Sequence, residues 1–289
     1  MALDSTSTSA VTPLTARKTW RTVEPLHGMI YFAPEATESY ARLGIRHEAG
    51  YFASRSAPMG AVGAETVIAT FYNFRPDLVR GAMAGVWDIA PPHAVLQARE
   101  EAADTALRRM LGVVVDSPEM ERAALLVRRA AERATERCAG RPLFAGHAGL
   151  PWPETPHVVV WHAQTLLREY RGDGHLAALM VNELDPVEAL VMHAASGEVP
   201  VPFLRTTRGW TDTEWEDAAA RLRRRGWLAP RGGDDQPLSL SEEGFEVLRE
   251  RRGERVAQMA AALSEEFTPA ELRQLMAVAP LMERLAQSL

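Results

Sequence analysis

The chain contains a single cysteine, Cys138, among its 289 residues. One cysteine excludes an intramolecular disulfide, and this usage is typical of a reducing compartment, so we expect a cytoplasmic protein. No apolar run reaches the roughly 18 to 20 residues that a membrane-spanning helix requires. Residues 1–18 are rich in Ser and Thr and lack the apolar core of a secretion signal, so they predict a flexible tail. We therefore expect no membrane partner.

Positive charge is also in short supply. The chain carries 32 Lys and Arg against 38 Asp and Glu, which gives a formal net charge of −6. Neutralisation of phosphates by Lys and Arg supplies most nonspecific affinity for nucleic acid. The composition therefore gives no support for an electrostatic grip on DNA, although it leaves room for a local basic patch. The hydrophobic fraction of 46% is that of a globular protein with an ordinary core.

Recognisable catalytic and cofactor motifs are missing as well. The sequence contains no GxSxG, no Walker loop, no GxGxxG and no HExxH. His157 and His162 are five residues apart, which turns them roughly 140° from each other on a helix, whereas zincin ligand pairs are four apart. We predict no metal and no cofactor. A polar network that lines a pocket is the better interpretation of these histidines.

What the sequence does contain is helical patterning punctuated by proline and glycine. Pro91 and Pro92 predict the start of a long helix, and Ser117-Pro118 predicts the start of an amphipathic helix with its arginines outside. Residues 140–156 form a Gly/Pro-rich connector. We place a domain boundary there, with an N-terminal helical unit at 19–145 and a second unit at 146–289.

The second unit has an informative order of elements. A helix ends near Gly209, and the next begins at Thr211 or Asp212 and ends at Gly226. Residues 227–241 predict a small β-hairpin with its tip at Gly232 to Asp235. A long amphipathic helix and a last helix from Pro269 to about Gln287 complete the chain.

This order, with the turn Leu240-Ser241-Glu242-Glu243-Gly244 in place of the family's "LT-x-x-G", resembles the MarR family of winged helix-turn-helix regulators over residues 180–285. The whole chain also resembles actinobacterial proteins described only by a helix-turn-helix, which conveys fold without activity. The first resemblance implies a winged helix that binds DNA as a homodimer. It also implies phenolic or other lipophilic ligands, bound where the helical core meets the winged unit.

An internal duplication is the strongest prediction from the residues. Glu65–Trp87 aligns with Glu188–Trp210, and each segment begins with Glu and ends with Trp 22 positions later. The hairpin is short or lost in the first copy. We therefore predict a mainly α fold of two fused, pseudo-dimeric winged helix-turn-helix units with one β-hairpin wing. Such a chain would be a monomer or a homodimer.

Residues 157–200 are rich in histidine and supply most candidate site residues. His175 follows a predicted turn at Arg171 to Gly174, where a helix N-terminus would keep its imidazole neutral and suited to acid-base chemistry with Glu169. Backbone capping is an equal alternative for His175, and burial in the core is the commoner role for a histidine such as His193. Arg168 is available for an anionic ligand group. The predicted ligand-binding residues are Trp161, His162, Arg168, His193, His27, Tyr31 and Tyr72.

The predicted recognition helix argues against DNA. Its first two turns, from Thr211 to Asp217, carry four acidic residues that would repel phosphates, and its arginines come late. We therefore predict a repurposed MarR-like protein that binds an organic ligand, aromatic or natural-product-like, with weak or no DNA binding. Two alternatives stay open: a ligand-responsive transcriptional regulator that binds DNA, and a cofactor-free biosynthetic enzyme that uses His175 and Glu169 in the same pocket.

Overall fold

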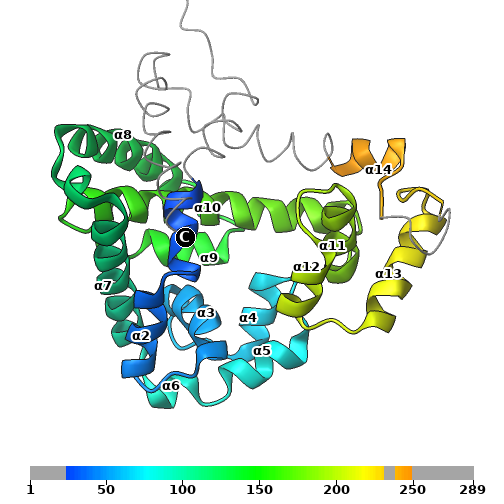
Figure 1. Cartoon of the computed structure of the whole chain (residues 1–289), viewed down its shortest axis with the longest axis horizontal. Helices are drawn as coiled ribbons and strands as arrows, with labels where there is room; N and C mark the ends of the chain where they lie inside the picture. The colour runs from blue at the N-terminus through cyan, green and yellow to red at the C-terminus, as the bar shows by residue number, and fades with distance from the viewer. Residues whose placement is uncertain (1–23, 231–237, 249–289) are drawn as a thin grey trace, which may run out of the picture.

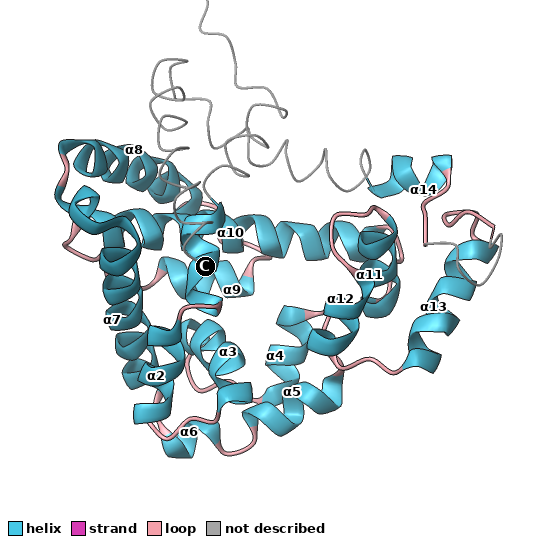
Figure 2. Cartoon of the chain, in the orientation of Figure 1, coloured by secondary structure: helices cyan, strands magenta, loops and turns pink. Residues whose placement is uncertain are grey.

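The computed structural model describes residues 24–230 and 238–248, and these residues form helices joined by short loops (Figures 1 and 2). The prediction of a mainly helical protein is confirmed. Within the two described ranges the backbone forms no β-strand. The predicted N-terminal tail, the hairpin tip, most of the long amphipathic helix and the last helix lie outside the described residues.

Short helices dominate the N-terminal half of the chain, and proline begins many of them because it fits the first turn without losing a hydrogen bond. A turn of helix at residues 24–28 and the 3₁₀ turn η1 (Met29–Tyr31) come first. The α-helices of this half are α2 (Pro34–Arg42), α3 (His47–Ser56), α4 (Ala64–Phe71), α5 (Pro76–Met83), α6 (Val86–Ile89), α7 (Pro92–Leu111) and α8 (Pro118–Thr135).

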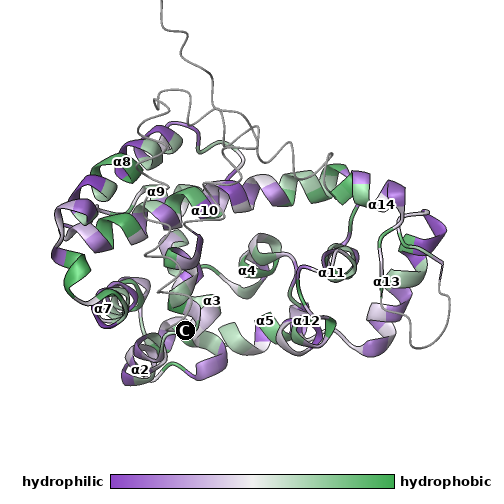
Figure 3. Ribbon diagram, turned by 45° about the horizontal axis from the view of Figure 1, so that its top comes forward, coloured by the Kyte–Doolittle hydropathy of each residue, from purple (hydrophilic) through white to green (hydrophobic). Residues whose placement is uncertain are grey.

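The predicted helix starts at Pro92 and Pro118 are confirmed. Ser117 caps α8, since its side chain accepts the backbone N–H of Met120. Figure 3 shows polar and apolar residues alternating along α8, and the burial of Ala124 and Val127 beside exposed Arg122 confirms the predicted amphipathic helix.

The second half is built around one long helix. The long helix is α10 (Pro156–Val181). The other described helices of this half are α9 (Pro142–Ala148), α11 (Pro186–Ala195), α12 (Val201–Arg208), α13 (Asp212–Arg224) and α14 (Glu242–Glu246). The capping predictions are confirmed: Thr211 and Glu214 form a capping box at the start of α13, and Gly226 lies just past its end with a left-handed φ of 76°.

The helix α10 is continuous, so the turn predicted at Arg171 to His175 is wrong. Gly172 and Gly174 lie inside the helix, although glycine weakens a helix by about 1 kcal/mol each. Burial along α8 and α9 offsets this, and the Asp173 carboxylate accepts the backbone N–H of Phe144 at 2.9 Å. His175 therefore lies in the middle of a helix, and the helix N-terminus expected to keep it neutral is not there.

Two apolar clusters form the interior. The first runs from Leu26 to Tyr170 and includes α2 to α9 with the first half of α10, and the second runs from Leu179 to Leu248. Figure 1 shows α10 reaching from the α8 side of the molecule to α11. The clusters divide inside α10, whereas the predicted domain boundary at residues 145/146 precedes it. That boundary stays a prediction, because apolar clusters describe packing and not units that fold alone.

The region expected to form the wing is described only at its base. Leu228 and Leu240 form one isolated antiparallel bridge. Ser241 caps α14 by accepting the N–H of Gly244 at 3.0 Å. A Cβ at Gly244 would lie 1.8 Å from the Trp227 carbonyl oxygen, so only glycine fits there. The Leu240 to Gly244 turn thus fastens α14 onto the end of α13.

Candidate functional site

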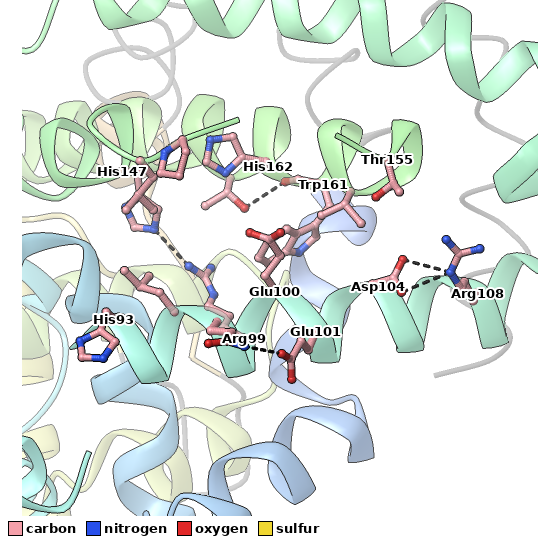
Figure 4. A pocket seen from close by; sticks show the side chains of 16 residues that line it. His93, Arg99, Glu100, Glu101, Asp104, Arg108, His147, Thr155, Trp161 and His162 are labelled. Carbon is pink, nitrogen blue, oxygen red and sulfur yellow. Dashed lines mark hydrogen bonds and ion pairs between the residues drawn. The ribbon is translucent and has the colours of Figure 1, made fainter. Parts of the chain in front are cut away.

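A pocket of about 600 Å³ lies between α7 and α10, next to α9 (Figure 4). This volume falls within the range of small-molecule sites, about 300 to 1,000 Å³. One face of α10 contributes Val158, Trp161, His162 and Thr165, spaced as neighbours on a helix. The segment around α9 adds His147, Leu150 and Pro151. The α7 side chains are His93, Leu96, Gln97, Arg99, Glu100, Glu101, Asp104 and Arg108.

Arg99 lies at the bottom of this pocket and is only 2% exposed. It occupies a position in the buried stripe of α7, among Val95, Ala98 and Ala102. Its Nη1 donates to His147 Nε2 at 3.2 Å, while Nε and Nη2 are buried without a hydrogen-bond partner. Among the described residues, no carboxylate forms an ion pair with Arg99. Its guanidinium lies 5.0 Å from the centre of the Trp161 ring.

His147 cannot neutralise Arg99, because its contacts fix it as a neutral acceptor. The Nδ1 atom lies 2.9 Å from the Leu143 carbonyl oxygen, which assigns the proton to Nδ1 and leaves the Nε2 lone pair to accept from Arg99. Burial, helped by the charge of Arg99, lowers the pKa of His147 to about 3. His147 is therefore neutral at physiological pH.

The charge of Arg99 also reaches two other histidines. Burial followed by the charge of Arg99 lowers the pKa of His162 to about 4. Burial, Arg168 and Arg99 together hold the pKa of His27 well below its ordinary value. Neutral imidazoles around an unpaired guanidinium leave the floor of the pocket positive.

The α7 side of the pocket carries three carboxylates. Glu101 accepts from Gln97 Nε2 at 2.8 Å, and Asp104 contacts His157 Nε2 at 2.5 Å and Arg108 Nε at 3.1 Å. Glu100 makes no hydrogen bond or ion pair within the part of the chain that the structure describes. Although Glu100 is an exposed residue, partial burial of its carboxyl group, together with the charges of Asp104 and Glu101, raises its pKa. The pocket thus combines a positive floor with an acidic α7 side.

The structure brings two of the predicted ligand-binding residues to this pocket. Trp161 is buried, and its indole Nε1 has no hydrogen-bond partner. His162 packs edge-on against Trp152 with the ring centres 4.9 Å apart. Both residues therefore line the pocket with ring surface.

Glu169 and Arg168 instead belong to a buried ion-pair network. Arg55 Nη2 donates to both carboxylate oxygens of Glu169 at 2.9 Å, and Arg168 Nη1 donates to Glu169 at 3.0 Å. Arg168 Nε donates to Glu24 at 3.0 Å. Burial alone would raise the pKa of Glu169, but the charges of Arg55 and Arg168 outweigh it and hold the pKa well below 4.5. These contacts favour a structural role.

His27 and Tyr31 connect this network to the pocket. The Thr165 hydroxyl donates to the Trp161 carbonyl, so it accepts from His27 Nδ1 at 2.9 Å. Tyr31 then donates its hydroxyl to His27 Nε2 at 2.7 Å. Of these three residues only Thr165 lines the pocket. His27 and Tyr31 support its wall from behind.

Three predicted site residues lie elsewhere. His175 follows Thr165 by ten positions on α10, about 15 Å along the helix axis. The Tyr72 hydroxyl donates to the Leu184 carbonyl, and His193 Nδ1 lies 3.8 Å from Glu198 on the second cluster's side of the molecule. The predicted residues therefore do not converge on one site.

Sequence reasoning missed Arg99, His147 and Glu100. One signal could have found Arg99: it interrupts the apolar stripe of α7, where a buried charge is rare. His147 gave no signal beyond being a histidine in a Gly/Pro-rich connector. In residues 24–230 and 238–248, no group of His, Cys, Asp or Glu side chains is arranged to hold a metal ion.

The fold and the pocket define a mainly helical protein with an unpaired cation at the bottom of a ligand-sized cavity. Among the described helices, none is both long and apolar enough to cross a membrane. The chain belongs to a helix-turn-helix family, whose model matches residues 16–288. No curated protein and no solved structure matches it.

Proposed function

We propose that this helix-turn-helix family protein binds a small aromatic anion in the pocket between α7 and α10, with Arg99 as the anchoring cation. The observation that carries the proposal is that Arg99 is 2% exposed, has two nitrogens without hydrogen-bond partners and forms no ion pair with a carboxylate in the described part of the chain. A buried charge without a partner is unfavourable. A ligand carboxylate or phenolate would remove that penalty.

The walls around Arg99 support an aromatic ligand. Trp161 and His162 present rings to the pocket, and Leu96, Leu150 and Val158 add apolar surface. Guanidinium groups bind carboxylates through two parallel hydrogen bonds. The Nε and Nη2 atoms of Arg99 have no partner but are buried, so the side chain must turn toward the pocket to supply these bonds to a ligand. The pocket therefore places a buried cation beside aromatic and apolar surface, a combination that small-molecule sites use.

The finer architecture, two fused MarR-like winged units, is part of the proposal. The helix order of Glu65–Trp87 and Glu188–Trp210 agrees, because each contains two helices and then a left-handed glycine, Gly85 or Gly209. The Leu240 to Gly244 turn also supports the likeness to MarR proteins. The tryptophans differ, since Trp87 donates to the Val62 carbonyl within its own half and Trp210 donates across to Asn73.

Weak or absent DNA binding is supported by the contacts of the basic residues on α12 and α13. Arg221 forms ion pairs with Asp185 and Glu188 at the start of α11. Arg225 donates to the Asn182 and Glu183 carbonyls, and Arg205 pairs with Asp212 and Glu216. These arginines hold the helices together, and the start of α13 presents exposed acids, of which Asp212 and Glu216 pair with Arg205. Phosphates would meet that acidic end.

A second candidate function is that of a ligand-responsive regulator that binds DNA, which membership of a helix-turn-helix family favours. Fluorescence anisotropy with the protein's own upstream DNA distinguishes the two. Specific binding that weakens steeply with salt, and that a pocket ligand changes, would establish the regulator. The third alternative, acid-base catalysis, finds little support in the contacts of Glu169 or the position of His175.

Isothermal titration calorimetry with 2-naphthoate tests the proposal, with the uncharged 2-naphthalenemethanol as the matched probe. We expect the anion to bind more tightly than the alcohol, and Arg99→Met to weaken the anion about 10- to 100-fold without weakening the alcohol. Arg122→Met removes an exposed arginine of α8 and is the control. Equal binding of both probes, or no binding of either, would contradict the proposal.

A further inference from the structure

We infer that the ligand of this pocket is amphoteric: its anionic group meets Arg99, while an amine at its other end meets the carboxylate of Glu100. The inference rests on the proposed anion binding and extends it to a class of ligand, the aromatic amino carboxylates. It follows from two pocket-lining side chains of opposite charge, Arg99 and Glu100, neither of which pairs with an opposite charge within the described residues.

The two unpaired charges are neighbours in sequence that do not pair with each other. Consecutive residues of a helix point about 100° apart, so their side chains do not face one another. Figure 4 shows the Arg99 guanidinium directed toward His147 and the Glu100 carboxylate directed toward Trp161. Neither an ion pair nor a hydrogen bond joins them within the described residues. Neither charge is therefore neutralised by the other.

Glu100 differs from the two carboxylates beside it. Glu101 is held by Gln97, and Asp104 is held by both His157 and Arg108. Within the described residues, Asp104 thus pairs with Arg108, Glu101 contacts only a neutral amide, and Glu100, an exposed residue, makes no hydrogen bond. Its pKa is raised by burial and by the charges of Asp104 and Glu101. A cation placed at Glu100 would lower this pKa, because it would stabilise the charged carboxylate and offset the negative charges of Asp104 and Glu101.

The surface between the two charges selects the body of the ligand. Trp161 lies against Arg99 and, with His162, forms the α10 wall of the pocket, while Leu96 adds apolar surface from α7. A flat ring packs against such a wall. An aliphatic amino acid would leave this wall uncovered, and a plain aromatic acid would leave Glu100 unpaired.

Calorimetry at pH 7.5 with matched probes tests the inference. The amphoteric probes are 4-(aminomethyl)benzoate and the longer 4'-(aminomethyl)biphenyl-4-carboxylate, which span two charge separations. Their partners without the amine are 4-methylbenzoate and 4'-methylbiphenyl-4-carboxylate. We expect at least one amphoteric probe to bind about ten-fold more tightly than its amine-free partner.

Variants assign this gain to its residue. Glu100→Gln should abolish the gain and leave the affinity for the amine-free acid unchanged, whereas Glu101→Gln, the matched control on the same helix, should preserve the gain. Arg99→Met should weaken both probes of a pair. An unchanged thermal midpoint for Glu100→Gln establishes that the variant is folded.

The outcomes separate the two proposals. If the amine-free acids bind through Arg99 and the amine adds nothing at either length, the inference is wrong and the proposed anion binding stands. If a gain survives Glu100→Gln, the amine binds elsewhere and the inference is again wrong. If no acid binds, the proposed function fails and the inference fails with it.

Discussion

Two arginines are buried in the same apolar cluster, yet their surroundings differ. Arg55 donates to both oxygens of Glu169 at 2.9 Å and to the Tyr51 hydroxyl at 2.7 Å, which leaves only its Nε without a hydrogen bond. Within the described residues Arg99 has a single hydrogen-bond partner, the neutral His147, at 3.2 Å. The first guanidinium is neutralised within the protein, and the second is not.

This difference separates a structural charge from a binding charge. A buried ion pair with good geometry can be close to neutral for stability, while an unpaired buried charge is destabilising. Proteins tolerate such local penalties mainly where function requires them. The surroundings agree with this division, because Arg55 lies in a packed network and Arg99 is among the residues that line a pocket.

The largest expected effect comes from breaking the paired site. Glu169→Gln keeps the shape of the side chain but leaves Arg55 without its anion and Arg168 with Glu24 alone. We expect the free energy of unfolding to fall by about 3 to 5 kcal/mol at pH 7, measured by urea titration. Glu132→Gln, in an exposed pair with Arg128, is the control and should change stability by less than about 1 kcal/mol.

The pH dependence of this variant has a definite sign. The pKa of Glu169 in the folded protein lies well below its ordinary 4.5, so its contribution is complete above about pH 5 and is lost as pH falls below 4.5. The stability difference between wild type and Glu169→Gln should therefore shrink as pH falls from 5 toward 3. A difference independent of pH would show that the carboxylate charge is not what holds the two arginines.

The unpaired site should respond in the opposite direction. Arg99→Met replaces an unpaired guanidinium by an apolar side chain of similar length, so we expect the ligand-free protein to gain about 1 to 2 kcal/mol of stability. Arg55→Met is the matched comparison. It should lower the free energy of unfolding by about 3 kcal/mol or more, because it removes one of the two arginines that neutralise the buried Glu169 carboxylate. If Arg99→Met destabilised the protein as much as Arg55→Met, Arg99 would be a structural residue and the contrast would disappear.

The local features of this fold were readable from the sequence. Pro92, Ser117 and Thr211 mark helix starts because capping depends on residues within one turn. The turn expected at Arg171 to His175 was wrong for a complementary reason. Glycine and aspartate favour turns locally, but Asp173 reaches the backbone of α9, 29 residues away in the sequence, and packing of the whole helix decides its course.

The candidate site was only half predictable. Trp161 and His162 could be found because aromatic and histidine side chains share one face of a predicted helix. Arg99 and His147 are 48 positions apart, and Arg55 and Glu169 are 114 apart, so neither pairing shows in local spacing. Arg168 was expected to be available for a ligand, but Glu24 and Glu169 occupy it. Which charges are paired depends on how helices pack, and the sequence pattern does not encode that directly.

Asp173 is an intermediate case that sharpens the comparison, because its carboxylate is buried, accepts backbone N–H groups and forms no ion pair within the described residues. Burial raises its pKa from 3.8 to about 6, which outweighs the hydrogen bond from Phe144 and the charge of Arg141. A raised carboxyl pKa means that the folded protein binds the proton more tightly, so this group lowers stability as pH rises from about 4 to about 6.

Asp173→Asn keeps an acceptor oxygen for the Phe144 N–H and removes the charge. We expect it to add about 1 kcal/mol to the free energy of unfolding at pH 7.5 and almost nothing at pH 4, measured by urea titration at both values. A loss of stability at pH 7.5 would instead mean that Arg141 neutralises Asp173, which would place this carboxylate with Glu169 among the paired charges.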